Sequence, residues 1–157
     1  MNIRARTFLD RPTVIEALEF KYVRVMARLG GFIRTTMQRL MRYRKRASEP
    51  GEPPTSWRGS AGNSGALRRL IEFGYDRNAH TLVVGPQLIK SPTIPLGGKS
   101  VPQLLDEGGS AMLRKLGGKS VLANFDARPF RQPAAEKGIN KFRELLATVP
   151  LIQIKGR

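Results

Sequence analysis

Cysteine is absent from this chain of 157 residues, and histidine occurs once, at position 80. The lack of cysteine excludes disulfide bonds, thiolate zinc sites and a cysteine nucleophile, and a single histidine excludes metal sites built on a histidine pair. His80 follows the turn residues Asp76–Asn78, so we expect it at a solvent-exposed loop position and not as a catalytic base. Apolar runs stay well short of the roughly 18–20 residues that a membrane span requires. The first ten residues contain two arginines and no apolar segment, which does not fit a signal peptide.

Acidic residues are also scarce. Twelve Asp and Glu face 28 Lys and Arg, which gives a formal net charge of +16. The surplus is largest in residues 1–47, which hold twelve basic and three acidic side chains. Such a charge favours a polyanionic neighbour, with nucleic acid as the first candidate and a membrane surface or an acidic protein as alternatives. A solvated basic face without a specific partner is the remaining interpretation.

The few carboxylates do not form a catalytic set. Asp106 with Glu107, and Asp126 near Arg128, could perform acid–base chemistry, but neither pair has a nucleophile or a second convergent acid beside it. Isolated acids at helix ends are usually caps or ion pairs. The sequence Leu-Gly-Gly-Lys-Ser-Val occurs twice without the upstream glycine of a phosphate-binding loop, and we interpret both copies as turns. We therefore expect no catalytic, cofactor or metal site, and a protein that is not an enzyme.

The N-terminal part of the chain predicts one long amphipathic helix over residues 13–47. Apolar residues recur there at steps of three and four, over roughly 50 Å at 1.5 Å per residue, which is longer than one small domain can cover. Gly30 and Gly31 interrupt the pattern at about 1 kcal/mol each, so a kink or a break into two helices stays open. The uncovered part of the stripe predicts a subunit interface. Its expected residues are Leu18, Tyr22, Val25, Leu29, Ile33 and Leu40.

The end of this helix is strongly basic. The densest cationic group of the chain consists of Arg39, Arg42, Arg44, Lys45 and Arg46. A helix dipole does not require so many cations, so we expect an anionic surface nearby. Because no base-reading motif or aromatic platform accompanies the group, contact with DNA phosphates would be independent of sequence. Acidic residues on a neighbouring protein ring are the alternative partner.

The rest of the chain predicts smaller elements. Residues 48–66 form a loop rich in proline and glycine, and Trp57, the only tryptophan, is expected to anchor this loop on a neighbouring subunit or on its own core. The predicted elements that follow are a hairpin (67–75 and 81–85), a short helix (101–107), a second hairpin (112–116 and 120–125), a last helix (132–147) and an edge strand (151–154). The expected fold class is α+β, with a small antiparallel sheet packed with the long N-terminal and the C-terminal helix. Residues 1–157 are expected to form a single domain.

Several short motifs occur in a fixed order along the chain. They are Pro50-Gly51-Glu52-Pro53-Pro54, Gly65-Ala66-Leu67-Arg68, Asp106-Glu107-Gly108-Gly109 and Ala127-Arg128-Pro129-Phe130 before the last helix. This order resembles that of the neck or tail-component proteins of tailed bacteriophages, the minor tail protein Z-like virion-morphogenesis family. The resemblance spans about residues 13–147, nearly the whole chain.

The resemblance implies a small α+β subunit of a homo-oligomeric ring, six-fold or twelve-fold, in the neck of the virion. Such a ring forms in the host cytoplasm. It contacts the portal-side adaptor on one side and the tail terminator or tail tube on the other, without a membrane. Genomic DNA passes through its channel, which agrees with the basic charge. A tail terminator or tail-completion ring is the close alternative, and a sequence-neutral basic nucleic-acid-binding protein is the alternative from a different class.

Overall fold

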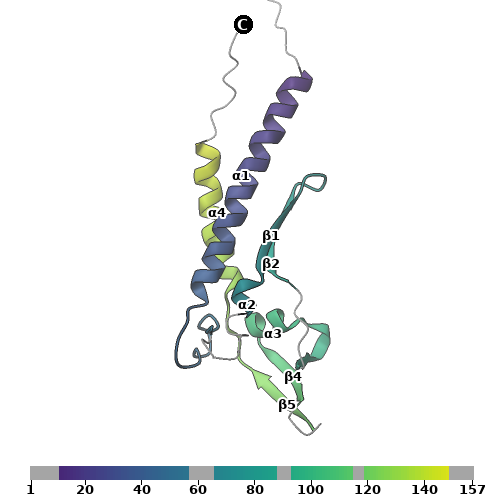
Figure 1. Cartoon of the computed structure of the whole chain (residues 1–157), viewed down its shortest axis with the longest axis vertical. Helices are drawn as coiled ribbons and strands as arrows, with labels where there is room; N and C mark the ends of the chain where they lie inside the picture. The colour runs from purple at the N-terminus through teal and green to yellow at the C-terminus, as the bar shows by residue number, and fades with distance from the viewer. Residues whose placement is uncertain (1–10, 57–65, 88–92, 115–118, 149–157) are drawn as a thin grey trace, which may run out of the picture.

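The computed structural model describes residues 11–56, 66–87, 93–114 and 119–148. Its elements are α1 (Arg11–Leu40), α2 (Ala66–Arg69), β1 (Ile71–Asp76), β2 (Thr81–Pro86), β3 (Thr93–Pro95), the 3₁₀ turn η1 (Leu96–Gly98), α3 (Val101–Glu107), β4 (Gly109–Arg114), β5 (Ser120–Phe125) and α4 (Arg131–Ala147). The molecule is elongated, with α1 and α4 side by side and the strands beside and below them (Figure 1). The predicted α+β class is confirmed, with two small antiparallel sheets where one was expected. Trp57 and the expected strand at 151–154 lie outside the described residues.

Helix α1 runs through Gly30 and Gly31 without a break, over 30 residues or about 45 Å. A Cβ atom at Gly30 would lie 2.4 Å from Cδ2 of Phe73 on β1, so close packing of the hairpin requires glycine at this position. A Cβ atom at Gly31 would meet nothing within 4 Å. The two glycines therefore differ: the first permits a contact, and the second has no packing role among the described residues.

Helix α1 ends at Leu40, seven residues before the predicted end. The Met41 side chain turns into the core, where it is only 1% exposed. The next residues pair with a later part of the chain, since the Ser56 amide donates to the Arg42 carbonyl and Tyr43 forms a parallel bridge with Ser56. This pairing competes with further helical hydrogen bonds. The prediction that most of the basic group lies on the helix was therefore wrong.

The core lies where α1, β1 and the start of α4 meet. Its buried members are Met37, Met41, Ile71, Phe130 and Ala134. Phe130, the last residue of the Ala-Arg-Pro-Phe motif, is fully buried and directly precedes α4. The motif thus fixes the start of α4 against the end of α1.

Helix α4 packs antiparallel to α1 through small residues (Figure 1). Its buried positions are Ala134 and Gly138, and a Cβ atom at Gly138 would lie 2.7 Å from Ile33. Ile139 and Leu146, two of the larger apolar residues of this helix, are 55% and 47% exposed. Close approach of the two backbones selects the face with alanine and glycine. Ile139 and Leu146 therefore point outward, whereas Phe142 and Leu145 are half-buried.

The length of α4 determines how much of α1 is covered. Ala147 lies nine residues after Gly138, and Arg24 lies nine residues before Ile33. Because both helices rise equally per residue, α4 ends beside about residue 24 of α1. The first buried residue of α1 is Val25. We call residues 11–24 the leading segment of α1 and residues 25–40 its packed segment.

Two sheets complete the fold. In the β1–β2 hairpin, Ile71 pairs with Pro86 and Asp76 with Thr81. The predicted hairpin is confirmed from Ile71 onward, whereas residues 66–69 form α2 and not strand. The second predicted hairpin is confirmed as β4–β5, and β3 adds a third strand that the sequence had not indicated. No described helix is long and apolar enough to cross a membrane.

Candidate nucleic-acid interface

The loop after α1 is fixed to the body of the molecule at several points. The Gly51 amide donates to the Ala127 carbonyl at 2.9 Å, and the Arg128 guanidinium donates to the Ser48 hydroxyl at 3.0 Å. Ser48 and Ser56 are both buried. The backbone that carries most of the basic group is therefore held in place, so that only the side chains of its cations have to be ordered when a partner binds.

The basic surface combines two elements. Its residues are Arg39, Arg42, Arg44, Lys45 and Arg46 at the end of α1 and in the loop, with Arg68 and Arg69 on α2. The first five are all exposed. The Arg68 guanidinium stacks over the Tyr43 ring at 4.9 Å, and Gln38 donates to the Arg68 carbonyl at 3.2 Å. These two contacts hold α2 beside the end of α1. Sequence reasoning missed Arg68 and Arg69, because nothing in the local pattern shows that α2 folds back to this place.

Acidic neighbours compensate only part of this charge. Arg44 forms an ion pair with Glu52 at 2.6 Å, and this hydrogen bond, with the charge of Arg44, lowers the pKa of the Glu52 carboxyl. Glu49 is the other carboxylate of the loop. The five cations at the end of α1 and in the loop exceed these two carboxylates and leave a positive surface that can attract phosphates. Since Arg68 covers one face of Tyr43, the surface fits contact with a backbone better than stacking of free bases.

The predicted subunit interface divides into two groups. Val25 and Leu29 are only 6% and 8% exposed, and Ile33 and Leu40 pack against the core. Val25 and Leu29 are therefore covered within the chain itself, whereas Ile33 and Leu40 are partly buried, and a subunit contact through them stays a prediction. Leu18 is 46% exposed and stays available.

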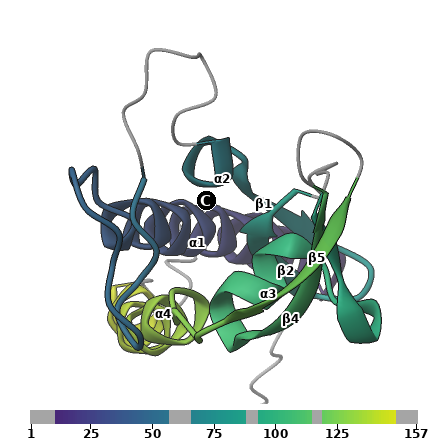
Figure 2. The ribbon, with the colours of Figure 1, turned by 90° about the horizontal axis from the view of Figure 1, so that it is seen from below.

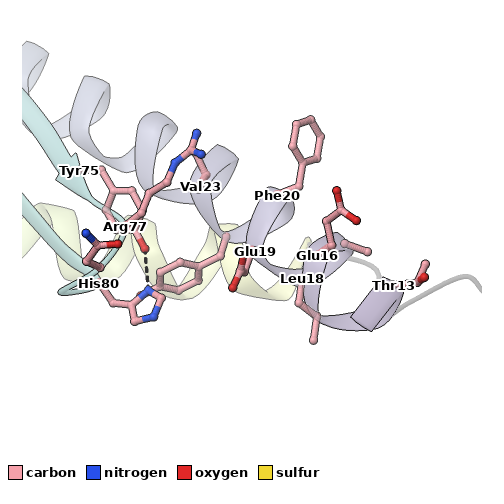
Figure 3. Close-up of a pocket in the computed structure, with 12 residues that line it drawn as sticks. Thr13, Glu16, Leu18, Glu19, Phe20, Val23, Tyr75, Arg77 and His80 are labelled. Atoms are coloured by element: carbon pink, nitrogen blue, oxygen red, sulfur yellow. Dashed lines mark hydrogen bonds between the residues drawn. The ribbon is translucent and has the colours of Figure 1, made fainter. Parts of the chain in front are cut away.

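Tyr22, the remaining predicted interface residue, lies in a groove between the leading segment and the hairpin tip (Figure 3). Its ring meets Tyr75 and His80 edge-on, at 5.8 and 5.9 Å between centroids. The Tyr75 hydroxyl and Nδ1 of His80 are 3.1 Å apart, and partial desolvation raises the pKa of Tyr75. His80 is exposed at the turn, as expected, with a positive φ of 50°. The groove thus holds an aromatic cluster that stabilises the hairpin tip.

The carboxylates near α4 have structural partners. Asp106 accepts hydrogen bonds from the amides of Phe130 and Arg131 at 2.8 and 3.0 Å, so a residue of α3 caps the N-terminus of α4. Arg131 also pairs with Asp106 and with Glu107, at 2.8 and 2.7 Å. These contacts join α3 to the start of α4, and the two helices are seen next to each other in the view from below (Figure 2). Among the described residues, no group of three metal-binding side chains lies close enough to hold an ion.

Comparison with known proteins gives no significant match to a family model, to a curated protein or to a solved structure. The resemblance to tailed-phage neck proteins therefore depends on the order of motifs along this chain. The described residues include an apolar surface on the leading segment and the basic surface. They lie toward opposite ends of α1.

Proposed function

We propose that this chain is a structural subunit of a ring in the head–tail connector, or neck, of a tailed bacteriophage. The observation that supports the proposal most is that the two ends of α1 have different surfaces. Its leading segment extends past its own core with apolar side chains exposed, while its other end bears a fixed basic surface. A subunit of this kind requires apolar neighbours at one place and an anion at another. A neck ring around the DNA channel supplies both, and a tail-terminator ring would do so equally.

Ring formation is supported by the exposed apolar residues. Ile15 and Leu18 are each 46% exposed on the leading segment, beyond the end of α4. An apolar helix face of this kind usually marks a contact with another protein. When such a face meets a different face of the next copy, the contact repeats, and it closes into a ring if the rotation allows.

A role beside DNA is supported by the fixed basic surface. Its cations come from the end of α1, the following loop and α2, and no base-reading element accompanies them. Contacts with phosphates hold a duplex without reading its sequence, as a channel requires. They also release counterions, so their affinity falls steeply with salt.

Imaging tests the ring. Negative-stain micrographs of the purified protein should show closed rings, and a gold-labelled tag on the chain should mark the neck of virions that contain it. A label on the capsid or on the tail tip would contradict the proposal. So would a chain that stays monomeric both alone and with the connector.

Binding assays test the DNA contact. Two unrelated duplexes should bind equally, and affinity should drop steeply between low and moderate salt. Arg42→Glu should weaken binding, whereas Lys137→Glu on the exposed side of α4 makes the same change in net charge and should weaken it much less. Equal losses would mean that net charge alone acts. Strong DNA binding without any ring would favour the free nucleic-acid-binding protein.

A further inference from the structure

The leading segment continues the apolar stripe of α1 that is buried farther along the helix. Leu18, Tyr22, Val25 and Leu29 follow one another at steps of four, three and four, so they lie on one stripe. Val25 and Leu29 are buried, whereas Leu18 and Ile15 are exposed because α4 ends beside residue 24. The exposed part therefore continues a stripe that is buried in the packed segment.

The outer face of α4 has a matching pattern. Ile139 and Leu146 are exposed on it, and Arg143 lies four residues after the first and three before the second. The leading segment shows the same spacing with the opposite charge, since Glu19 lies four residues after Ile15 and three before Tyr22. Neither Glu19 nor Arg143 forms an ion pair within the part of the chain that the structure describes. Each face thus has an exposed charge between two apolar side chains, of which Tyr22 is half-buried against Tyr75 and His80 of its own hairpin.

We infer that the outer face of α4 in one copy docks on the leading segment of α1 in the next copy, with Arg143 beside Glu19. The inference deepens the proposed function, on which it rests for the ring that this contact would build. Apolar contacts provide the affinity, and the charge pair sets the register, since an exposed ion pair adds little affinity by itself.

The two faces of one copy are already separated by its own fold. Gly138 holds the inner face of α4 against Ile33, so Ile139 points away from α1 of the same chain. Each copy therefore offers the outer face of α4 to one neighbour and the leading segment of α1 to the other. A contact between two different faces repeats from copy to copy, as a ring requires.

Cross-linking tests the contact directly, because the chain has no cysteine of its own. Copies carrying Leu18→Cys and copies carrying Ile139→Cys, with tags of different mass, are mixed and oxidised. A mixed disulfide dimer should form at least about tenfold more than in the control mixture of Phe20→Cys with Ile139→Cys. Phe20 is 62% exposed and points to a different side of α1 from Leu18 (Figure 3). Equal yields from the two mixtures would overturn the inference.

Charge reversal tests the register. Glu19→Arg and Arg143→Glu should each weaken self-association in sedimentation by up to about fivefold, the range of an exposed ion pair, and the double variant should recover. Glu16→Arg, which makes the same change outside the stripe, should have no effect. Losses that add in the double variant would contradict the pairing. All three residues are exposed, so the variants are expected to keep the circular dichroism of the parent chain.

The contact and the proposed function can fail separately. Closed rings that lack the Leu18–Ile139 link would leave the proposed function intact and refute the contact. The link without closed rings, or without a neck location, would support the contact and refute the proposed function. If residues 149–157 of the same chain cover Leu18, a cysteine at position 18 would resist maleimide in the monomer, and the inference would fail.

Discussion

The leading and packed segments of α1 belong to one uninterrupted helix, yet they have different surroundings. Leu18 and Leu29 lie on the same stripe, but the first is 46% exposed and the second 8%. Nothing in the spacing of apolar residues distinguishes them. The difference arises from the elements that reach each segment, which are α4 and the hairpin for the packed segment and only the hairpin tip for part of the leading one. An amphipathic pattern thus marks a face that can be covered, and the lengths of the other elements decide where the chain covers it itself.

Replacing Leu29 and Leu18 with alanine should give the largest difference in stability between the packed and the leading segment. Leu29→Ala removes buried methyl groups from the packed segment and should lower the free energy of unfolding by about 2–5 kcal/mol. Leu18→Ala changes an exposed side chain and should stay within about 0.5 kcal/mol. Urea denaturation of both variants measures the difference. Similar losses at the two positions would mean that the leading segment is also part of the core.

The adjacent glycines offer a second contrast inside the packed segment. Gly30→Ala forces a methyl group into the Phe73 ring and should cost about 1–3 kcal/mol. Gly31→Ala meets open space and should raise the free energy of unfolding by about 1 kcal/mol through helix propensity. Thermal or urea unfolding of the pair checks both signs. A gain at both positions would contradict the close contact between α1 and β1.

The cap at the N-terminus of α4 should affect the packed segment of α1 and not the leading segment. Asp106→Ala removes the acceptor for two amides at the start of α4 and should cost about 0.5–2 kcal/mol. Amide hydrogen exchange should rise in the packed segment, where α4 covers α1, and stay unchanged in the leading segment. Asp126→Ala, which changes an exposed acid directly after β5, serves as the control and should stay within about 0.5 kcal/mol.

The smallest expected effect is a dependence on pH. Hydrogen bonds from Arg131 and Lys99 lower the pKa of Glu107 below its ordinary value of 4.5. The unfolded chain then binds more protons than the folded one between the two pKa values, so this contribution is complete above about pH 4.5 and is lost as the pH falls through the folded pKa. Glu107→Gln should flatten that part of the curve of unfolding free energy against pH. An unchanged curve would mean that the ion pair does not form in solution.

The sequence predicted most of the elements but not the contacts between elements that lie far apart in the chain. Helices α1, α3 and α4 and both hairpins could be inferred from apolar periodicity and from the positions of proline and glycine, whereas α2 was predicted as strand. The packing face of α4 could not, because Ala134 and Gly138 carry little hydrophobic signal and their role depends on the close approach of Ile33. The basic group was found because charge is visible locally. Its extension by Arg68 and Arg69 depends on a fold-back that only contacts distant in the chain, such as that with Tyr43, establish.

The meeting of Ile33 with Gly138 joins residues 105 positions apart, and this separation has a consequence for synthesis. At about 5–20 residues per second, a ribosome needs roughly 5–20 s to add the intervening chain. During that interval the nascent chain exposes the α1 face that α4 later covers, including Val25 and Leu29. Two nascent chains on one message can therefore meet through α1 before either is complete. Because α4 is synthesised last, the time at which it emerges decides how long α1 can associate with another chain before α4 packs against it.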